Sequence, residues 1–220
     1  AGHPFQANAH MHLLEACLAW EALEPDGPWA AMADAIVALA RAHFIDARGG
    51  FLREFFDEAW RPAEGEAGRL VEPGHQFEWA WLLTRWGRLR GDPWAEAAAR
   101  RLYACGGRGL DADRGVAVDE LDDALAPRSG RARLWPQTEW LKAALILAET
   151  AHGDERGQLL RGAGQALRGL GLYLTPGGLW RDKLGPDGQF DAEPAPASSL
   201  YHIMAAGRQL RESLVALALR

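Results

Sequence analysis

The sequence predicts an all-α protein in which helical hairpins stand side by side around a ring. Apolar residues recur at helical spacing in seven segments, and Pro- and Gly-rich turns separate these segments. The order of helix, helix and turn-rich loop repeats about every 63 residues. This period is longer than that of tetratricopeptide or ankyrin repeats, and it suits hairpins that share a common centre.

The first hairpin is broken by Pro25-Asp26-Gly27-Pro28 and is followed by a loop that contains FLREFFD, residues 51–57. The short extended pieces and turn residues of this loop predict a small β-hairpin between helix pairs. Similar loops follow the second and third hairpins. In chain order, the predicted helices span residues 10–24, 29–44, 74–90, 93–106, 136–151, 155–172 and 197–218.

Composition limits the class of protein. With 220 residues, 48% of them hydrophobic, we expect one domain over residues 1–220. A net charge of −6 without a basic stripe disfavours nucleic-acid binding, and no apolar run is long enough to cross a membrane. Cys17 and Cys105 are too few for a disulfide framework, which favours the cytoplasm. We expect no cofactor, and a homodimer is one expected assembly. Because the chain begins at Ala1 without a methionine, we expect its N-terminus to be a cut.

Polar residues open the first helix of each predicted unit. His12, His75, Glu139 and His202 follow one another at intervals of 63, 64 and 63 residues, and loop glycines keep a similar period. Equivalent positions in a ring face its centre, so these side chains are predicted to gather in one polar pocket. Clusters of titratable groups in a pocket are typical of functional sites.

In the first helix, Asn8, His12 and Glu15 are spaced to share one face. All three are candidates for the pocket. The alternative is that Asn8 caps the helix and His12 satisfies a buried backbone group. A metal site at His10 and His12 is the less favoured option, because residues two apart on a helix point to different sides.

In the second unit, His75, Glu78 and Trp81 repeat the His-x-x-Glu spacing and add an aromatic one turn later. A histidine at a helix start feels the positive end of the helix dipole. We therefore expect a lowered pKa for His75 and a neutral imidazole that can act as a base. The alternative is that the tryptophans of this helix are core and His75 is incidental.

In the third unit, Trp135 stands at a helix entrance with Glu139 one turn inside. An indole face beside a carboxylate suits a sugar, which offers C–H groups to the ring and hydroxyls to the acid. Ordinary packing is the alternative for Trp135. His202 opens the last helix in phase with His75, and the alternative there is a partly exposed histidine without a task.

Together these segments resemble the N-acylglucosamine 2-epimerase superfamily of sugar epimerases and aldose-ketose isomerases. The matching segments are NAHMHLLEA at 8–16, EPGHQFEWAW at 72–81, LWPQTE at 134–139 and SSLYH at 198–202. The resemblance implies an (α/α)6 barrel of six hairpins, of which this chain supplies the C-terminal half, and it leans toward the mannose or mannose-6-phosphate isomerase branch. It implies that His75 and His202 are the acid/base pair. The implied sugar contacts or orienting residues are Asn8, His12, Glu78, Trp81, Trp135 and Glu139.

The function that we expect is metal-free proton transfer at C2 of an aldose through a cis-enediol or enediolate. Return of the proton to C1 isomerises the sugar, and return to the other face of C2 epimerises it. One alternative is glycoside hydrolysis with Glu78 and Glu139 as paired carboxylates. Another is a non-catalytic helical scaffold that binds carbohydrate.

Overall fold

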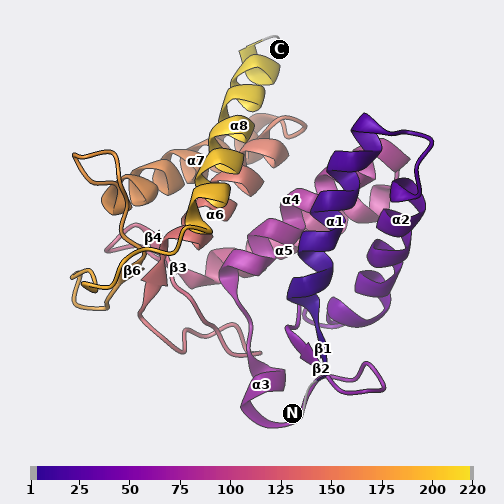
Figure 1. Cartoon of the computed structure of the whole chain (residues 1–220), viewed down its shortest axis with the longest axis horizontal. Helices are drawn as coiled ribbons and strands as arrows, with labels where there is room; N and C mark the ends of the chain where they lie inside the picture. The colour runs from indigo at the N-terminus through magenta and orange to yellow at the C-terminus, as the bar shows by residue number, and fades with distance from the viewer. Residues whose placement is uncertain (1–3, 219–220) are drawn as a thin grey trace.

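The computed structural model describes residues 4–218, and its two layers of helices confirm the predicted all-α architecture (Figure 1). The inner layer contains α1 (Ala7–Leu23), α4 (Pro73–Arg90), α6 (Leu134–Ala148) and α8 (Ser199–Ala218). The outer layer contains α2 (Trp29–Leu39), α5 (Pro93–Gly106) and α7 (Gly153–Tyr173). Three short pieces complete the helices: a π-helical turn that extends α2 (η1, Ala40–Phe44), α3 (Gly65–Arg69) and a 3-10 turn after α5 (η2, Gly107–Gly109).

The inner helices form a curved row. Each outer helix packs against the inner helix that precedes it in the chain, and the inner helices pack in the order α1, α4, α6, α8. The helices α1 and α8 are therefore the two ends of the row, with α4 and α6 between them (Figure 1). Because the loops connect at one side, α1 and α8 both begin near the same end of the molecule.

Helices α4 and α6 are buried on nearly all sides because neighbours surround them. Trp79 of α4 and Trp140 of α6 are among the largest fully buried side chains, and both helices also bury polar residues such as Gln76 and Gln137. The end helices differ, because they expose apolar side chains such as Leu23 of α1 and Met204 of α8.

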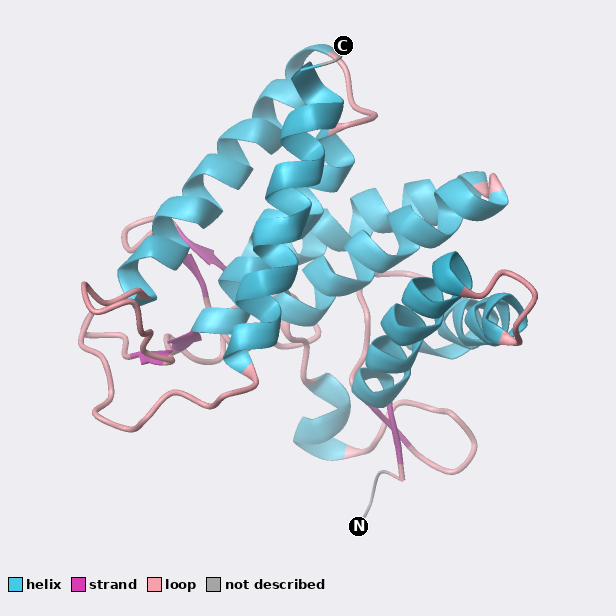
Figure 2. Cartoon of the chain, turned by 45° about the horizontal axis from the view of Figure 1, so that its top comes forward, coloured by secondary structure: helices cyan, strands magenta, loops and turns pink. Residues whose placement is uncertain are grey.

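The predicted β-structure is present as very short antiparallel pairs at the ends of the helices (Figure 2). One set forms local hairpins after each outer helix. Its members are the bridge Ile45–Leu52, the pair β3 (Leu110–Asp111) with β4 (Val116–Ala117), and the bridge Leu174–Trp180. In the tip of each hairpin, Gly50, Gly115 and Gly178 have φ of +70°, +68° and +78°, which explains their recurrence in the sequence.

A second set of pairs was not predicted, and it joins the entry of each inner helix to the loop that leaves its outer helix. Its members are β1 (Phe5–Gln6) with β2 (Phe55–Phe56), the bridge Val71–Leu121, and β5 (Ala132–Arg133) with β6 (Lys183–Leu184). Each helical hairpin is thus closed at its own base, next to the residues that open the inner helix.

Two glutamines give the structural register of the repeat. The side-chain amide of Gln76 bonds both backbone polar groups of Leu52, and Gln137 does the same with Ala117. These glutamines are equivalent and lie 61 residues apart, so Glu139 is the counterpart of Glu78. The sequence spacing had instead paired Glu139 with His75, and that alignment is wrong by one helical turn.

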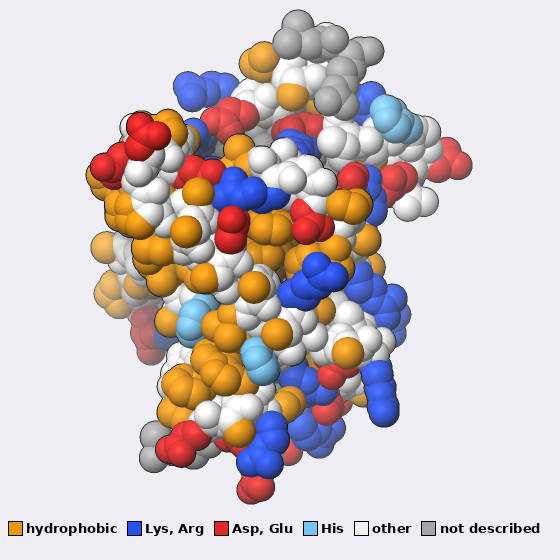
Figure 3. All heavy atoms as spheres, turned by 90° about the vertical axis from the view of Figure 1, so that its right-hand side faces the viewer, with side chains coloured by type: hydrophobic (Ala, Val, Ile, Leu, Met, Phe, Trp, Pro, Cys, Tyr) orange, Lys and Arg blue, Asp and Glu red, His pale blue; other side chains and the backbone are white. Residues whose placement is uncertain are grey.

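The surface shows mixed character. On the face in Figure 3, hydrophobic side chains lie among interspersed positive and negative ones, without one continuous basic field. None of the helices within residues 4–218 is long and apolar enough to cross a lipid bilayer.

Candidate active site

A cavity of about 310 Å³ lies where the four inner helices begin. It receives side chains from all four helices and from the loops beside them. Six of the residues singled out in the sequence line it: Asn8, His12, His75, Glu78, Trp135 and His202. The structure thus brings together side chains that are far apart in the sequence.

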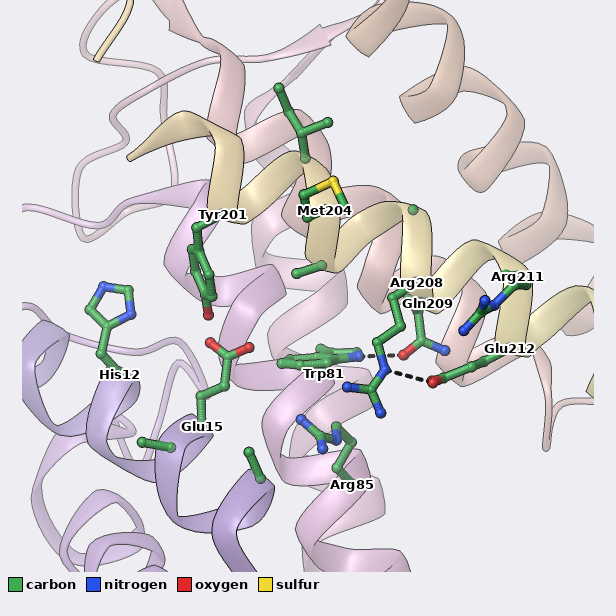
Figure 4. A pocket seen from close by; sticks show the side chains of 15 residues that line it. His12, Glu15, Trp81, Arg85, Tyr201, Met204, Arg208, Gln209, Arg211 and Glu212 are labelled. Carbon is green, nitrogen blue, oxygen red and sulfur yellow. Dashed lines mark hydrogen bonds and ion pairs between the residues drawn. The ribbon is translucent and has the colours of Figure 1, made fainter. Parts of the chain in front are cut away.

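A second, wider cavity of about 1010 Å³ continues between α1 and α8. His12 lines both cavities, so they adjoin. In Figure 4, Glu15 of α1, Trp81 of α4 and Tyr201 of α8 face one another across this space. The indole nitrogen of Trp81 donates to Oε1 of Gln209 at 2.7 Å, which holds the ring in place.

His75 is buried and bonded to a carboxylate that the sequence did not indicate. Its Nδ1 lies 2.8 Å from Oε2 of Glu54 and 3.5 Å from Oε2 of Glu72. Burial alone would lower the pKa of His75, but the two carboxylates outweigh it and raise the pKa to about 10. The prediction of a lowered pKa is therefore wrong, because two anions beside the ring exceed the effect of the helix start. His75 carries a proton at neutral pH.

His202 has its own carboxylate partner. Its Nδ1 lies 2.8 Å from Oε1 of Glu139, and Oε2 of Glu139 lies 2.7 Å from Nζ of Lys142. Burial alone would raise the pKa of Glu139, but Lys142 and His202 outweigh it and hold the pKa below its usual value. Glu139 is thus a carboxylate that accepts Nδ1–H. Within the described residues, no hydrogen bond uses Nε2 of His202.

The indole of Trp135 separates the two histidines. Its ring centroid lies 5.0 Å from that of His75 and 5.7 Å from that of His202. The guanidinium of Arg133 lies 5.4 Å from the same ring. Helix α4 approaches so closely that a Cβ on Gly74 would stand 2.4 Å from the indole. Trp135 is therefore a shared wall of the cavity, held at the start of α6.

Glu78 is a buried acid whose surroundings favour its protonated form. Both of its oxygens are buried and make no hydrogen bond within the described part of the chain. Burial, and then Glu139, raise the pKa of Glu78 well above its usual value, against the opposing effects of Lys142 and His75. Nδ1 of His12 is 3.9 Å from Oε1 of Glu78, and partial burial, followed by His75 and His202, lowers the pKa of His12. Both shifts favour the neutral side chain, and a neutral carboxyl or imidazole can donate a hydrogen bond to a hydroxyl group and accept one from it.

Two sets of side chains bring potential metal ligands within 4.8 Å of one another: His12 with Glu15 and Glu78, and Glu78 with Glu139 and His202. The ammonium group of Lys142 already places a positive charge beside Glu139. A metal ion bound there would meet repulsion from it. The expectation of metal-free chemistry remains a prediction.

Sequence reasoning missed Glu54 and Lys142. Glu54 lies in the loop before β2, where the pattern gives no reason to prefer it over neighbouring acids. Lys142 did leave a signal, because it is a lone lysine in the apolar run WLKAALIL, one turn after Glu139. It is fully buried.

Comparison with known proteins places this geometry in a family. The model of the N-acylglucosamine 2-epimerase (GlcNAc 2-epimerase) family matches residues 3–206. The chain belongs to the N-acylglucosamine 2-epimerase family. This agrees with the resemblance that four short segments had indicated.

Individual members of the epimerase family and solved structures extend the comparison. The chain is 51% identical over 216 residues to mannose-6-phosphate isomerase from Rhizobium meliloti (strain 1021), which is 96% of this chain and 56% of that protein. A cellobiose 2-epimerase from Spirochaeta thermophila DSM 6192 matches with a TM-score of 0.79 at 23% identity, over 98% of this chain and 54% of that one. A D-mannose isomerase matches with a TM-score of 0.82 at 18% identity, over 94% and 56%. These likenesses show the fold, and the chain spans about half the length of the proteins it matches.

Proposed function

We propose that this chain carries the acid/base machinery of a sugar isomerase or 2-epimerase acting at C2 of an aldose. The observation that carries the proposal is the pairing of His75 and His202 across one cavity. Each ring has its Nδ1 bonded to a carboxylate at 2.8 Å, and both rings border the same indole. A cavity between two such imidazoles suits proton transfer at one carbon.

The two histidines have different roles in this proposal. His202, with its Nδ1 proton held by Glu139, uses Nε2 to take the C2 proton of the open-chain aldose. The C2–H electrons form the C1–C2 double bond, and the carbonyl electrons move to O1. His75, which is protonated through Glu54 and Glu72, stabilises the enediolate at O1 or gives it a proton.

The fate of the proton then decides the product. If His75 has given its proton to O1, delivery of the proton on His202 to C1 and return of the O2 proton to His75 give the ketose. If His75 has kept its proton, its delivery to the opposite face of C2 restores the C1 carbonyl and gives the epimer, with the abstracted proton left on His202. We favour aldose-ketose isomerisation of a mannose-type sugar, because the relative at 51% identity is named a mannose-6-phosphate isomerase. Asn8, His12, Glu78, Trp81 and Trp135 would hold the sugar by hydroxyl bonds and ring contacts.

Glycoside hydrolysis by Glu78 and Glu139 is not favoured. Glu139 uses one oxygen for His202 and the other for Lys142, so neither is free to attack or protonate a glycosidic bond. Family membership points the same way. Release of reducing ends from an oligosaccharide would reverse this ranking.

The test is deuterium exchange. The natural full-length protein is incubated with a panel of aldoses in D2O, and NMR follows both C2 exchange and product identity. Because a general acid or base contributes about 10²–10⁴ in rate, His75→Asn and His202→Asn should each lose at least about 10²-fold in exchange.

His152→Asn is the matched control, since His152 is exposed just before α7 and lines neither cavity. This variant should catalyse deuterium exchange at C2 at the same rate as the unaltered protein. Retained exchange in either cavity variant would contradict the role of that histidine. Sugar binding by calorimetry without any turnover would support a binding scaffold instead.

A further inference from the structure

We propose that Lys142 is a positioning residue of this reaction: its ammonium group keeps Glu139 ionised and thereby keeps Nε2 of His202 free to accept the C2 proton. The inference rests on the proposed function, because it concerns how the base is prepared. Lys142 lines neither cavity, so it acts through Glu139 and not on the sugar.

The geometry forms a chain of three groups. Lys142 and Glu139 lie one turn apart on α6, and both are completely buried. Nζ of Lys142 is 2.7 Å from Oε2 of Glu139, and Oε1 of the same carboxylate is 2.8 Å from Nδ1 of His202. One carboxylate thus joins a permanent cation to the proposed base.

The position of Lys142 is fixed from a second side. Its ammonium lies 3.9 Å from the ring centroid of Trp81, on the neighbouring helix α4. The indole of Trp81 is itself held by Gln209 of α8. The flexible side chain of Lys142 is therefore confined between a carboxylate and an aromatic face. A purely apolar residue could fill the same space, but it would supply no charge.

The surrounding charges explain why a cation is needed there. Glu139 interacts electrostatically with Glu78 from α4, Glu15 and His12 from α1, and His202 from α8, while Arg85 of α4 interacts with Glu15. Three carboxylates in one buried region cannot all stay ionised without compensation. Because Lys142 lies against Glu139 at 2.7 Å, the charged form is favoured at Glu139 and the neutral form at Glu78, in line with the opposite shifts of their pKa values.

Removal of the cation would let Glu139 take up a proton. A protonated carboxyl is a poorer acceptor for Nδ1–H, and it can donate to Nδ1 instead. The second case favours the histidine tautomer with its proton on Nε2, which cannot accept a proton from sugar. A residue that only filled space would have no such effect on a histidine of another helix.

The test reads the tautomer of His202 directly. Histidines are labelled with ¹⁵N in the natural full-length protein, and two-dimensional NMR across a pH series assigns the protonated nitrogen. His202→Asn identifies the His202 signal. Lys142→Met removes the charge and keeps an apolar stem. Lys183→Met is the matched control, because Lys142 and Lys183 are the only lysines of the sequence and Lys183 pairs with Glu193 outside the site.

In the unaltered protein and in K183M, neutral His202 should carry its proton on Nδ1. In K142M, the form of His202 with its proton on Nε2 should appear. The rate of C2 exchange should fall at least about tenfold, while KM stays within about twofold of the value for the unaltered protein. The acid limb of the pH-rate profile should move to higher pH. A folded K142M with the original tautomer and rate profile would overturn the proposal.

Two further outcomes remain decisive. If K142M does not fold, the tautomer of neutral His202 in the unaltered protein still tests the proposal. A proton on Nε2 there would overturn the proposal. A proton on Nδ1 that is lost in K142Q would support it. If no aldose exchanges but the tautomer changes in K142M, the proposed function fails while the Lys142–Glu139–His202 relation stands.

Discussion

His75 and His202 are the same residue type, and their partners make them chemically different. His75 faces two carboxylates, at 2.8 and 3.5 Å, whereas the carboxylate that His202 faces is shared with a lysine. Identical side chains can therefore divide the work of acid and base, because the charge around each ring differs.

Replacement of Glu54 should reveal this difference. In Glu54→Gln, the pKa of His75 should fall from about 10 toward its usual range, because the closest anion is removed. The alkaline limb of the rate profile should then move to lower pH. A full pH-rate series measures it, and an unchanged alkaline limb would contradict the role of His75 as the acid.

The interaction between His75 and Glu54 also stabilises the folded state, and this contribution depends on pH. The pKa of His75 is higher in the folded state than its unfolded value, so the pair stabilises fully below about pH 6.5 and the contribution is lost as pH rises through about 10. E54Q should cost about 3 kcal/mol at pH 7, as expected when one partner of a buried pair is removed. Denaturant melts should show the difference from the unaltered protein narrowing near pH 10.

At the scale of elements, the starts of α4 and α6 meet at one glycine. In Gly74→Ala, the new Cβ would stand 2.4 Å from two atoms of Trp135, and the indole would have to turn away. We expect KM for the sugar to rise about tenfold, which corresponds to about 1.4 kcal/mol of lost ring contact.

Gly171→Ala on α7 is the control, because a Cβ there would meet no atom within 4 Å beyond the adjoining residues of its own helix. It should leave KM unchanged. An unaltered KM in G74A would show that Trp135 does not hold the sugar.

Elements were predictable where local chemistry determines them. Helical spacing located every long helix, and the loop glycines marked the hairpin tips, because both signals depend on neighbouring residues. The pairing of strands at the base of each unit was not predictable, since β1 and β2 are two residues long and about 50 residues apart. Two-residue strands carry too little alternation to read.

In the candidate site, too, features set by neighbouring residues were predictable and features set by distant contacts were not. Residues on helix starts could be found from repeated spacing, as with His75 and Glu78. Glu54 could not, because its role depends on a contact with His75, which is 21 residues further along the chain, beyond β2 and α3. The error in the pKa of His75 has the same origin: the helix start is visible in the sequence, whereas the anions that outweigh it become adjacent only in the fold.

At the scale of the whole molecule, the row of inner helices formed by residues 4–218 ends at α1 on one side and at α8 on the other. Leu214 and Val215 of α8 are 58% and 59% exposed, and Leu23 of α1 is 76% exposed. Exposed apolar surface of this kind favours association. The homodimer expected from the sequence stays a prediction, and so does the single domain over residues 1–220.

The 220-residue chain on its own should therefore self-associate as its concentration rises, and Leu214→Glu with Val215→Glu should shift it toward the monomer. Sedimentation velocity measures the change. Leu172→Glu is the control, since Leu172 is 46% exposed on the outer helix α7, away from the ends of the row. Equal sedimentation of the double variant and the unaltered chain would contradict the prediction.

Closure of each hairpin at its own base has a consequence for how such a molecule can change through evolution. Each strand pair joins the segment before the inner helix to the loop after the outer helix of the same unit. A duplicated or deleted unit therefore keeps or loses its strand pair as a whole. The side chains proposed to meet the substrate lie beside those strand pairs, at the bases of separate units. A lineage can thus exchange one wall of the pocket by replacing a single hairpin, while the neighbouring walls keep their shape.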